Sequence, residues 1–336
     1  MTALGLRNSY LYIFPTTYEK RTKRYKGIQT HVSLKKFSFL ADSIFRKAVT
    51  NMNSKNVSFS VLIPFFNDSA TIRRALDSIS NQTLLPAEVI IVDDASTEVE
   101  NAKLREILIE YSHLQPSLIV LPENQGPSTA RNAGWKNATA DFVAFLDADD
   151  SWHPSKLELQ ANTLQKNPEI VLLGTARSYR EDSHPENEKE SRISLITPAK
   201  QLFRNRFVTS SVVVSRTINN RFNENLRYSE DNDLWCRVIL ATHLAANLQS
   251  FLTFYHKPIR SAEGASGQYL KMFQGQYRVF QGLYEDSLIS IPLLSLAISS
   301  AAVRFGRRML LVSVDKLRNF GNQTSNNGTL TRSKRK

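Results

Sequence analysis

The sequence predicts an α/β fold built around a parallel sheet. Apolar runs of strand length alternate with helical segments over residues 57–150, a pattern typical of parallel βαβ units. Asp147, Asp149 and Asp150 directly follow one of these runs, at the carboxyl end of a strand, where open α/β sheets bind ligands. Beyond residue 150 the segments are mixed, so we expect an α+β second half joined to the first sheet.

The first half contains four expected strands with helices between them. The strand at 57–64 is an almost continuous apolar run, which indicates a strand buried on both faces. In the helix that follows, Ile72, Ala75, Leu76 and Ile79 share one face. The remaining elements are a strand at 88–92, a helix at 98–112, a strand at 117–121, a helix at 127–138 and a strand at 141–146.

The second half is expected to combine helices and strands without a regular alternation. Residues 180–192 are polar and typical of a loop. The expected elements are a helix at 153–166, a strand at 169–174, a strand at 208–215 and a helix at 231–246, followed by a strand that leads into a loop near residue 256.

The net charge of +12 is concentrated at the two ends of the chain. Residues 1–55 carry 11 Lys and Arg against 2 acids, and residues 304–336 carry 9 against 1, which leaves the centre at −5. Basic ends attract anionic surfaces, including phospholipid headgroups and RNA. No recognisable motif interleaves aromatic and basic residues, so we expect no nucleic-acid partner. We expect residues 1–55 to form a basic, flexible extension and residues 319–336 a disordered basic tail.

The C-terminal region, residues 261–318, is expected to be helical. Residues 287–303 carry no charge, and Arg304, Arg307 and Arg308 follow them. An apolar stretch beside arginines suits a helix that lies in a membrane interface, and the alternative is an ordinary helical hairpin packed on the domain. The single Cys236 excludes an internal disulfide and fits a reducing compartment, and no N-terminal stretch has the order of a secretory signal.

The three aspartates are the strongest sign of chemistry. Carboxylates crowded at the end of a buried strand repel one another, unless a divalent cation lies between their oxygens. We therefore expect a metal that holds a diphosphate among the carboxylates of Asp147, Asp149 and Asp150. The alternative is that Asp150 and Ser151 cap the helix near Pro154, which explains one carboxylate and not three.

Further candidate residues lie in three other segments. Asp94, chosen over Asp93, closes the second strand, where it could accept from a nucleotide or cap a loop. Gly126-Pro127 opens a helix whose first turn favours anions, and Arg131 on that helix could reach a diphosphate or remain a surface residue. Glu230 and Asp231 stand at a helix start, where one carboxylate could be a general base or merely an acid that favours the helix dipole.

Taken in order, these segments resemble the family 2 glycosyltransferases, whose fold is called GT-A. The resemblance covers residues 57–260. The matching stretches are Val61-Leu-Ile-Pro-Phe-Phe-Asn67, Val92-Asp-Asp-Ala-Ser96, Asn124-Gln-Gly, Ala130-Arg-Asn-Ala-Gly134, Asp147-Ala-Asp-Asp150 and Ser229-Glu-Asp-Asn-Asp-Leu-Trp235. The resemblance implies a Rossmann-like nucleotide-sugar half over 57–150, an acceptor half over 151–260, and Mn²⁺ or Mg²⁺ at the DXD-type acids.

The resemblance also implies a role for each candidate residue. Asp231 would be the catalytic base of an inverting transfer. The others would bind substrate or metal: Pro64, Phe66 and Asp94 at the nucleotide base, Asp147 at the ribose, Arg131 at the diphosphate, Glu230 at the substrate, and Asp149 and Asp150 at the metal.

These expectations combine into one predicted function. The chain would move a sugar from a nucleoside-diphosphate sugar, with UDP as the expected nucleotide, to a glycan or lipid-linked acceptor in cell-surface polysaccharide synthesis. It would act in the cytoplasm, in peripheral contact with the anionic inner face of the cytoplasmic membrane. The alternative is a catalytically inactive relative that binds a nucleotide sugar or serves as a scaffold in a synthase complex.

Overall fold

The computed structural model describes residues 56–179, 192–256 and 268–332. The basic N-terminal extension expected at 1–55 and the last four residues of the basic tail lie outside these ranges. The polar segment expected at 180–192 lies outside them except for its last residue.

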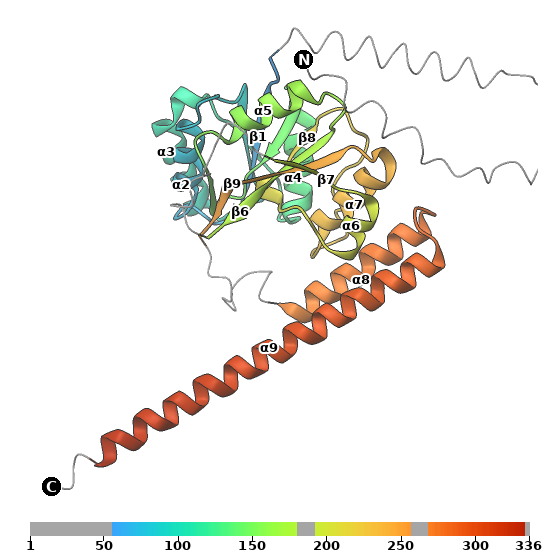
Figure 1. The fold of residues 1–336 in the computed structure, drawn as a ribbon. Helices are drawn as coiled ribbons and strands as arrows, with labels where there is room; N and C mark the ends of the chain where they lie inside the picture. The colour runs from blue at the N-terminus through green and yellow to red at the C-terminus, as the bar shows by residue number, and fades with distance from the viewer. Residues whose placement is uncertain (1–55, 180–191, 257–267, 333–336) are drawn as a thin grey trace, which may run out of the picture. The chain divides into compact units, whose positions relative to one another are not determined.

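The first half of the chain forms the parallel sheet that the sequence predicts (Figure 1). Its four strands lie in the order β3-β2-β1-β4, and each neighbouring pair is parallel. The strands are β1 (Phe59–Phe65), β2 (Glu88–Asp93), β3 (Ser117–Val120) and β4 (Phe142–Phe145). The carboxyl ends of β1, β2 and β4 therefore share one edge of the sheet, where the acidic motifs begin.

Helices cover both faces of this sheet. Successive side chains of a strand point to opposite faces, so Val61 and Ile63 of β1 pack in one apolar cluster and Leu62 packs in the other. The first cluster includes side chains from α2 (Ile72–Ser80), α3 (Glu98–Glu110) and α5 (Lys156–Lys166). The second includes side chains from α4 (Pro127–Asn137) and α7 (Glu230–Thr242). The candidate residues on α4 and α7 thus belong to one face.

The second half adds five strands, which make a mixed sheet of nine in the described part of the chain. β8 pairs antiparallel with β4, which joins the two halves. The added strands are β5 (Asp150–Trp152), β6 (Leu172–Ser178), β7 (Ile193–Leu195), β8 (Val213–Ser215) and β9 (Ala245–Tyr255). Short 3-10 turns lie at Ser112–Leu114 and Thr209–Ser211. The predicted α/β fold with a mixed second half is confirmed.

Some expected elements differ in the structure. The strand expected at 208–215 begins only at Val213, after the 3-10 turn at Thr209–Ser211. The helix expected at 231–246 ends at Thr242, because His243 adopts a left-handed conformation (φ 58°) and the chain then enters β9 at Ala245. The sequence alternative in which Asp150 and Ser151 cap a helix is wrong, because Asp150–Trp152 forms β5 and pairs antiparallel with β9. A three-residue strand carries no periodic signal, so its partner strand decides its conformation.

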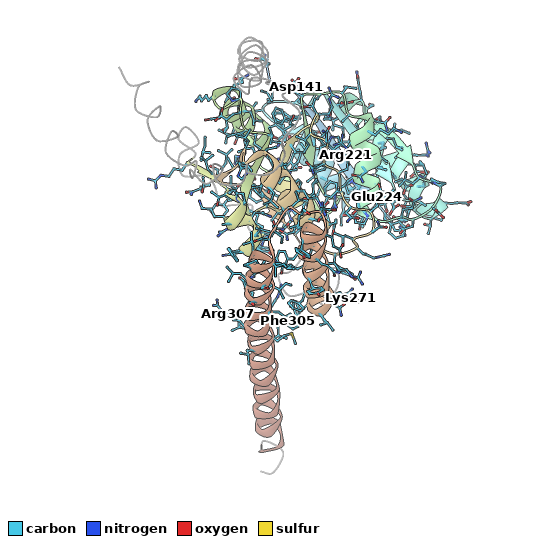
Figure 2. The ribbon with its side chains drawn as sticks, turned by 90° about the vertical axis from the view of Figure 1, so that its right-hand side faces the viewer. Asp141, Arg221, Glu224, Lys271, Phe305 and Arg307 are labelled. Atoms are coloured by element: carbon cyan, nitrogen blue, oxygen red, sulfur yellow. The ribbon has the colours of Figure 1, made fainter. Side chains whose placement is uncertain are left out.

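Two C-terminal helices form a hairpin, which we call the C-terminal hairpin. It consists of α8 (Tyr269–Glu285) and α9 (Ile291–Arg332), which pack along each other with Phe273 stacked on Phe305 at 4.9 Å (Figures 1 and 2). The hairpin shares a buried cluster with α6 (Pro198–Phe203) and α7. Within residues 56–179, 192–256 and 268–332, no helix is both long and apolar enough to cross a bilayer.

The disordered tail expected from residue 319 is not what the structure has up to Arg332, because α9 continues to that residue. Polar composition suggested disorder, but Pro292 is the last proline of the chain. A helix that has already begun in a packed segment extends with no further nucleation cost, so it can run on through polar residues.

Candidate active site

The candidate site lies where the parallel strands end. Asp147 follows β4, which ends at Phe145, and three residues later the chain enters β5 at Asp150. Arg131 comes from the second turn of α4, and Glu230 and Asp231 open α7. These three segments are separate in the sequence, and the fold brings their polar side chains together.

Arg131 links the acid segment to the start of α7. Its side chain is 5% exposed, its Nη2 donates to Asp147 Oδ1 at 2.7 Å, and its Nη1 donates to Glu230 Oε1 at 3.2 Å. Burial disfavours the charged guanidinium, but the carboxylates of Asp147 and Glu230 outweigh it and raise the pKa of Arg131. The ring of Phe222 lies 5.3 Å from the guanidinium carbon. Arg131 is therefore a fixed, buried cation and not the surface residue of the alternative interpretation.

Glu230 and Asp231 are largely, though not fully, buried carboxylates beside each other, and the Glu230 side chain is 15% exposed. Burial and, to a smaller extent, the neighbouring charge of Asp231 raise the pKa of Glu230 to about 7, against the opposing pull of Arg131. Burial also raises the pKa of Asp231, although hydrogen bonds from the Asn232 amide at 2.7 Å and from Asn205 Nδ2 at 3.1 Å favour its charged form. A carboxylate with a raised pKa is a stronger base than an ordinary one.

Asp94 caps a loop, as one of the two sequence interpretations proposed. It is 3% exposed, and its two oxygens accept the backbone amides of Gln125 and Gly126, each at 2.8 Å. These bonds fix the turn that starts α4, where Gly126 has a φ of 91°. Asp93 instead accepts the amide of Ser96 at 2.9 Å. A contact between Asp94 and a nucleotide stays a prediction.

The acid segment divides into buried and partly exposed carboxylates. Asp150 is 4% exposed and its Oδ2 accepts the Ser210 hydroxyl at 2.5 Å, whereas Asp149 is partly exposed and its carbonyl accepts Arg74 Nη2 at 2.7 Å. Among the described residues, no three His, Cys, Asp or Glu side chains converge to hold a metal by themselves. Mg²⁺ and similar ions are often held by one or two carboxylates together with substrate phosphates, and this donor set fits that mode.

The other two predicted substrate contacts lie on β1 and just after it. Pro64 is a half-buried residue near the end of β1, and Phe66 follows the strand with its side chain 46% exposed. An exposed aromatic ring at the carboxyl edge of a sheet is available for stacking on a planar ligand. The contact of these two residues with a nucleotide base stays a prediction.

Sequence reasoning missed three polar residues around the site. Asn205 contacts Asp231, Gln201 of α6 contacts Asn205 at 3.0 Å, and Ser210 contacts both Asp150 and the backbone amide of Asp147 at 3.1 Å. Asn205 and Ser210 lie far along the chain from the aspartates that they contact, and none of the three belongs to a periodic pattern. No signal in the sequence alone identified them.

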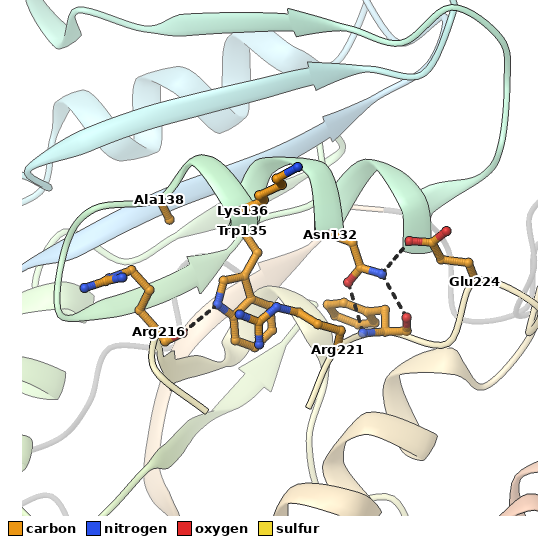
Figure 3. Close-up of a pocket in the computed structure, with 8 residues that line it drawn as sticks. Asn132, Trp135, Lys136, Ala138, Arg216, Arg221 and Glu224 are labelled. Atoms are coloured by element: carbon orange, nitrogen blue, oxygen red, sulfur yellow. Dashed lines mark hydrogen bonds between the residues drawn. The ribbon is translucent and has the colours of Figure 1, made fainter. Parts of the chain in front are cut away.

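A pocket of ≈ 590 Å³ lies away from the carboxylates, beside α4 (Figure 3). Arg221 covers the Trp135 ring at 4.3 Å, and Asn132 binds the backbone of Phe222 and the Glu224 carboxylate. These contacts fix Phe222, whose ring supports Arg131. The residues that line the pocket therefore help to hold Arg131 in place through Phe222.

Comparison with known proteins identifies the family. The sequence model described as glycosyl transferase family 2 matches residues 60–224, which include most of the motifs above. The amylovoran biosynthesis glycosyltransferase AmsE of Erwinia amylovora is 31% identical over 202 residues, covering 58% of this chain and 74% of that relative. The chain belongs to glycosyltransferase family 2. It is thus a glycosyltransferase, as the sequence predicted.

Two further relatives align with this glycosyltransferase. The UDP-Glc:alpha-D-GlcNAc-diphosphoundecaprenol beta-1,3-glucosyltransferase WfgD of Escherichia coli is 27% identical over 232 residues, 69% of this chain and 88% of that relative. AmsB of Erwinia amylovora, also an amylovoran biosynthesis glycosyltransferase, is 40% identical over 114 residues, which span only 33% of this chain and 37% of that relative.

Solved structures share the fold of this glycosyltransferase. The mannosyltransferase PcManGT from Pyrobaculum calidifontis, in complex with GDP-Man and Mn²⁺, has a TM-score of 0.56 at 18% identity and covers 85% of this chain and 90% of that chain. TarS of S. aureus in complex with UDP-GlcNAc has a TM-score of 0.57 at 19% identity, covering 73% of this chain and 72% of that chain. The GT-A expectation is confirmed.

Proposed function

We propose that this glycosyltransferase inverts the anomeric centre of a sugar that it moves from a nucleoside-diphosphate donor to a glycan or lipid-linked acceptor. The observation that carries the proposal is the buried Arg131, which binds Asp147 of the acid segment and Glu230 beside the base candidate. One cation thereby joins the segment proposed to hold the donor to the segment proposed to activate the acceptor.

Asp231 is the proposed base. It takes the proton of an acceptor hydroxyl as that oxygen attacks the anomeric carbon, and the bond from this carbon to the diphosphate oxygen breaks on the opposite side. The raised pKa of Asp231 suits proton removal. Negative charge that develops on the leaving diphosphate is met by Arg131, which costs no reorganisation because its contacts already fix it. No covalent nucleophile is needed.

The proposed cofactor is Mn²⁺ or Mg²⁺, with Asp149 as the direct ligand. Asp150 is buried against Ser210 and is proposed to support the metal from behind. A bound cation would act as a Lewis acid that draws charge from the departing diphosphate. Asp147, held by Arg131, is proposed to face the ribose, and Pro64, Phe66 and Asp94 are proposed to meet the nucleotide base.

The proposed donor is a UDP-sugar and the proposed acceptor is lipid-linked. WfgD is named for a UDP-glucose donor and a diphosphoundecaprenol-linked acceptor, and it aligns over 88% of its length. The amylovoran biosynthesis relatives support a role in polysaccharide synthesis. A lipid-linked acceptor requires the enzyme to work at a membrane, and we propose the cytoplasmic face of the cytoplasmic membrane.

The C-terminal hairpin is the proposed membrane contact. On α9, Leu296, Val303 and Leu310 recur every seven residues and are 56%, 72% and 69% exposed. Arg307 lies on the same helix, and residues 287–312 contain three arginines and no acid (Figure 2). Exposed apolar side chains beside cations suit the surface of an anionic bilayer, because the apolar side chains can insert among the lipids and the anionic headgroups attract the arginines.

A donor screen with a matched variant tests the proposed reaction. The full chain is incubated with UDP- and GDP-sugars and Mn²⁺ or Mg²⁺, and released nucleoside diphosphate is measured. We expect one donor to be hydrolysed or transferred, and Asp231→Asn to lower turnover by about a hundredfold or more while donor binding, followed by thermal stabilisation, is kept. Donor binding by the wild type with no release from any donor would favour the inactive relative.

A further inference from the structure

Asp231 depends on a side chain from outside its own helix. Its Oδ1 accepts the backbone amide of the next residue, Asn232, at 2.7 Å. Its Oδ2 accepts Nδ2 of Asn205 at 3.1 Å, from the chain that follows α6. The bond from Asn205 is therefore the contact that fixes the carboxylate relative to the rest of the site.

The orientation of Asn205 is determined by a buried glutamine. Gln201 is fully buried, and its Oε1 accepts the backbone amide of Arg206 at 3.1 Å. Its Nε2 must then face the other way, where it donates to the Oδ1 atoms of Asn205 and Asn232, each at 3.0 Å. Because Asn205 Oδ1 receives this bond, its Nδ2 is directed at Asp231.

The C-terminal hairpin holds this arrangement from one side. Leu202, the neighbour of Gln201, is 1% exposed and packs in the buried cluster with Val279 and Phe280 of α8 and Ala297 and Ala301 of α9. Arg304 of α9 donates to the carbonyl of Phe203, at the last residue of α6, and to Ser300 Oγ at 2.7 Å. Helix α6 has six residues, and both its buried Leu202 and its last carbonyl contact the hairpin.

The same hairpin holds the chain just before the base. At Gly275 of α8, a Cβ atom would come within 2.5 Å of the Tyr228 carbonyl oxygen, so α8 approaches this segment as closely as glycine allows. Tyr228 also donates its hydroxyl to Gln268 Oε1 at 3.0 Å. The next residue, Ser229, has a φ of 63°, a conformation that non-glycine residues keep only where their surroundings enforce it.

We propose that Asn205 and Gln201 are positioning residues for the base Asp231, and that the C-terminal hairpin sets their geometry through Leu202 and Arg304. The inference rests on the proposed role of Asp231 and extends it: the hairpin is part of the catalytic unit, and not only a surface appendage. Among the described residues, the charged or titratable groups that act on or respond to Asp231 are Arg131 of α4, Asp147 after β4, Glu230 and Cys236 of its own helix and Tyr255 of β9.

The test compares the pH dependence of turnover in matched variants. Asn205→Ala removes a donor to the charged carboxylate, so the pKa of Asp231 rises and the acidic limb of kcat moves up by about one pH unit, with KM for the donor unchanged. Arg304→Ala moves the limb in the same direction by a smaller amount, and Arg304→Lys, which keeps a donor for the Phe203 carbonyl, restores it. Arg278→Ala, which removes an exposed arginine from α8, leaves the profile unchanged.

A second readout separates this inference from the proposed reaction. The carboxyl groups of Glu230 and Asp231 are titrated by ¹³C NMR in the wild type, Asn205→Ala and Arg304→Ala, which requires no turnover. If the carboxyl pKa shifts in the two variants but the wild type turns over no donor, the positioning role is kept and the proposed function is overturned. Normal wild-type turnover with unshifted titrations and pH profiles in both variants would overturn the positioning role alone. Circular dichroism and a cooperative unfolding transition confirm that each variant is folded.

Discussion

Glu230 is expected to destabilise the fold at neutral and alkaline pH. Its pKa rises from an ordinary value of 4.5 to about 7 in the folded chain, because burial and the charge of Asp231 disfavour the carboxylate. When the pKa of a carboxyl group is higher in the folded chain than in the unfolded chain, the group costs no unfolding free energy at a pH below its unfolded pKa. The unfolding free energy then falls as the pH rises through the folded pKa. The difference between 4.5 and about 7 corresponds to roughly 3 kcal/mol of unfolding free energy, fully lost above pH 7.

The variant Glu230→Gln tests this reasoning, because glutamine keeps an oxygen for Arg131 and cannot ionise. We expect the variant to be more stable than the wild type by roughly 3 kcal/mol at pH 8 and by little below pH 4.5. Urea unfolding at both values measures the difference, and Glu106→Gln, an exposed position on α3, is the control. Equal stabilities at pH 8, or a difference that grows toward low pH, would refute the argument.

Two further predictions concern the metal and the membrane. Asp149→Asn should weaken donor binding at least tenfold in Mn²⁺ and leave it unchanged in the presence of a chelator. Asp150→Asn should mainly lower stability, by about 1–3 kcal/mol, because Ser210 loses a charged acceptor. If calorimetry showed the opposite pattern for the two variants, Asp150 would be the metal ligand. The double variant Val303→Ser, Leu310→Ser should float with anionic vesicles at least tenfold less than the wild type. Ser299→Ala, at an exposed position on the same helix, should float like the wild type. Unchanged flotation of the double variant would show that α9 is not the membrane contact.

The sequence was sufficient where a local pattern agrees with the tertiary structure. The apolar runs of β1, β2 and β4 and the shared face of α2 predicted both the elements and the parallel sheet, because a strand buried on two faces must be apolar throughout. The proximity of Arg131 to Asp147 also follows from the order of motifs, since α4 and Asp147 both follow strands of the parallel sheet. Glu230 and Asp231 come after the antiparallel β8, so only the packing of α7 brings them to the same place.

The sequence was insufficient where long-range partners decide the outcome. Asp150 looked like its neighbours Asp147 and Asp149, yet its place in β5 buries it against Ser210, and only the pairing with β9 determines that. The hydrogen bond from Asn205 to Asp231 joins residues 26 apart, and the buried amide of Gln201 orients Asn205 for it. A short polar segment after a six-residue helix offers no periodicity, so such contacts appear only once the helices are packed.

The single cysteine has a practical consequence for following this enzyme. Cys236 is buried in α7, and burial raises the pKa of its thiol, so the unreactive protonated form dominates. A fluorescent maleimide should therefore label a thiol introduced by Val303→Cys and spare the native one. The colour of an environment-sensitive dye at that point would then report, on a single molecule of enzyme, the moment at which α9 leaves water for lipid.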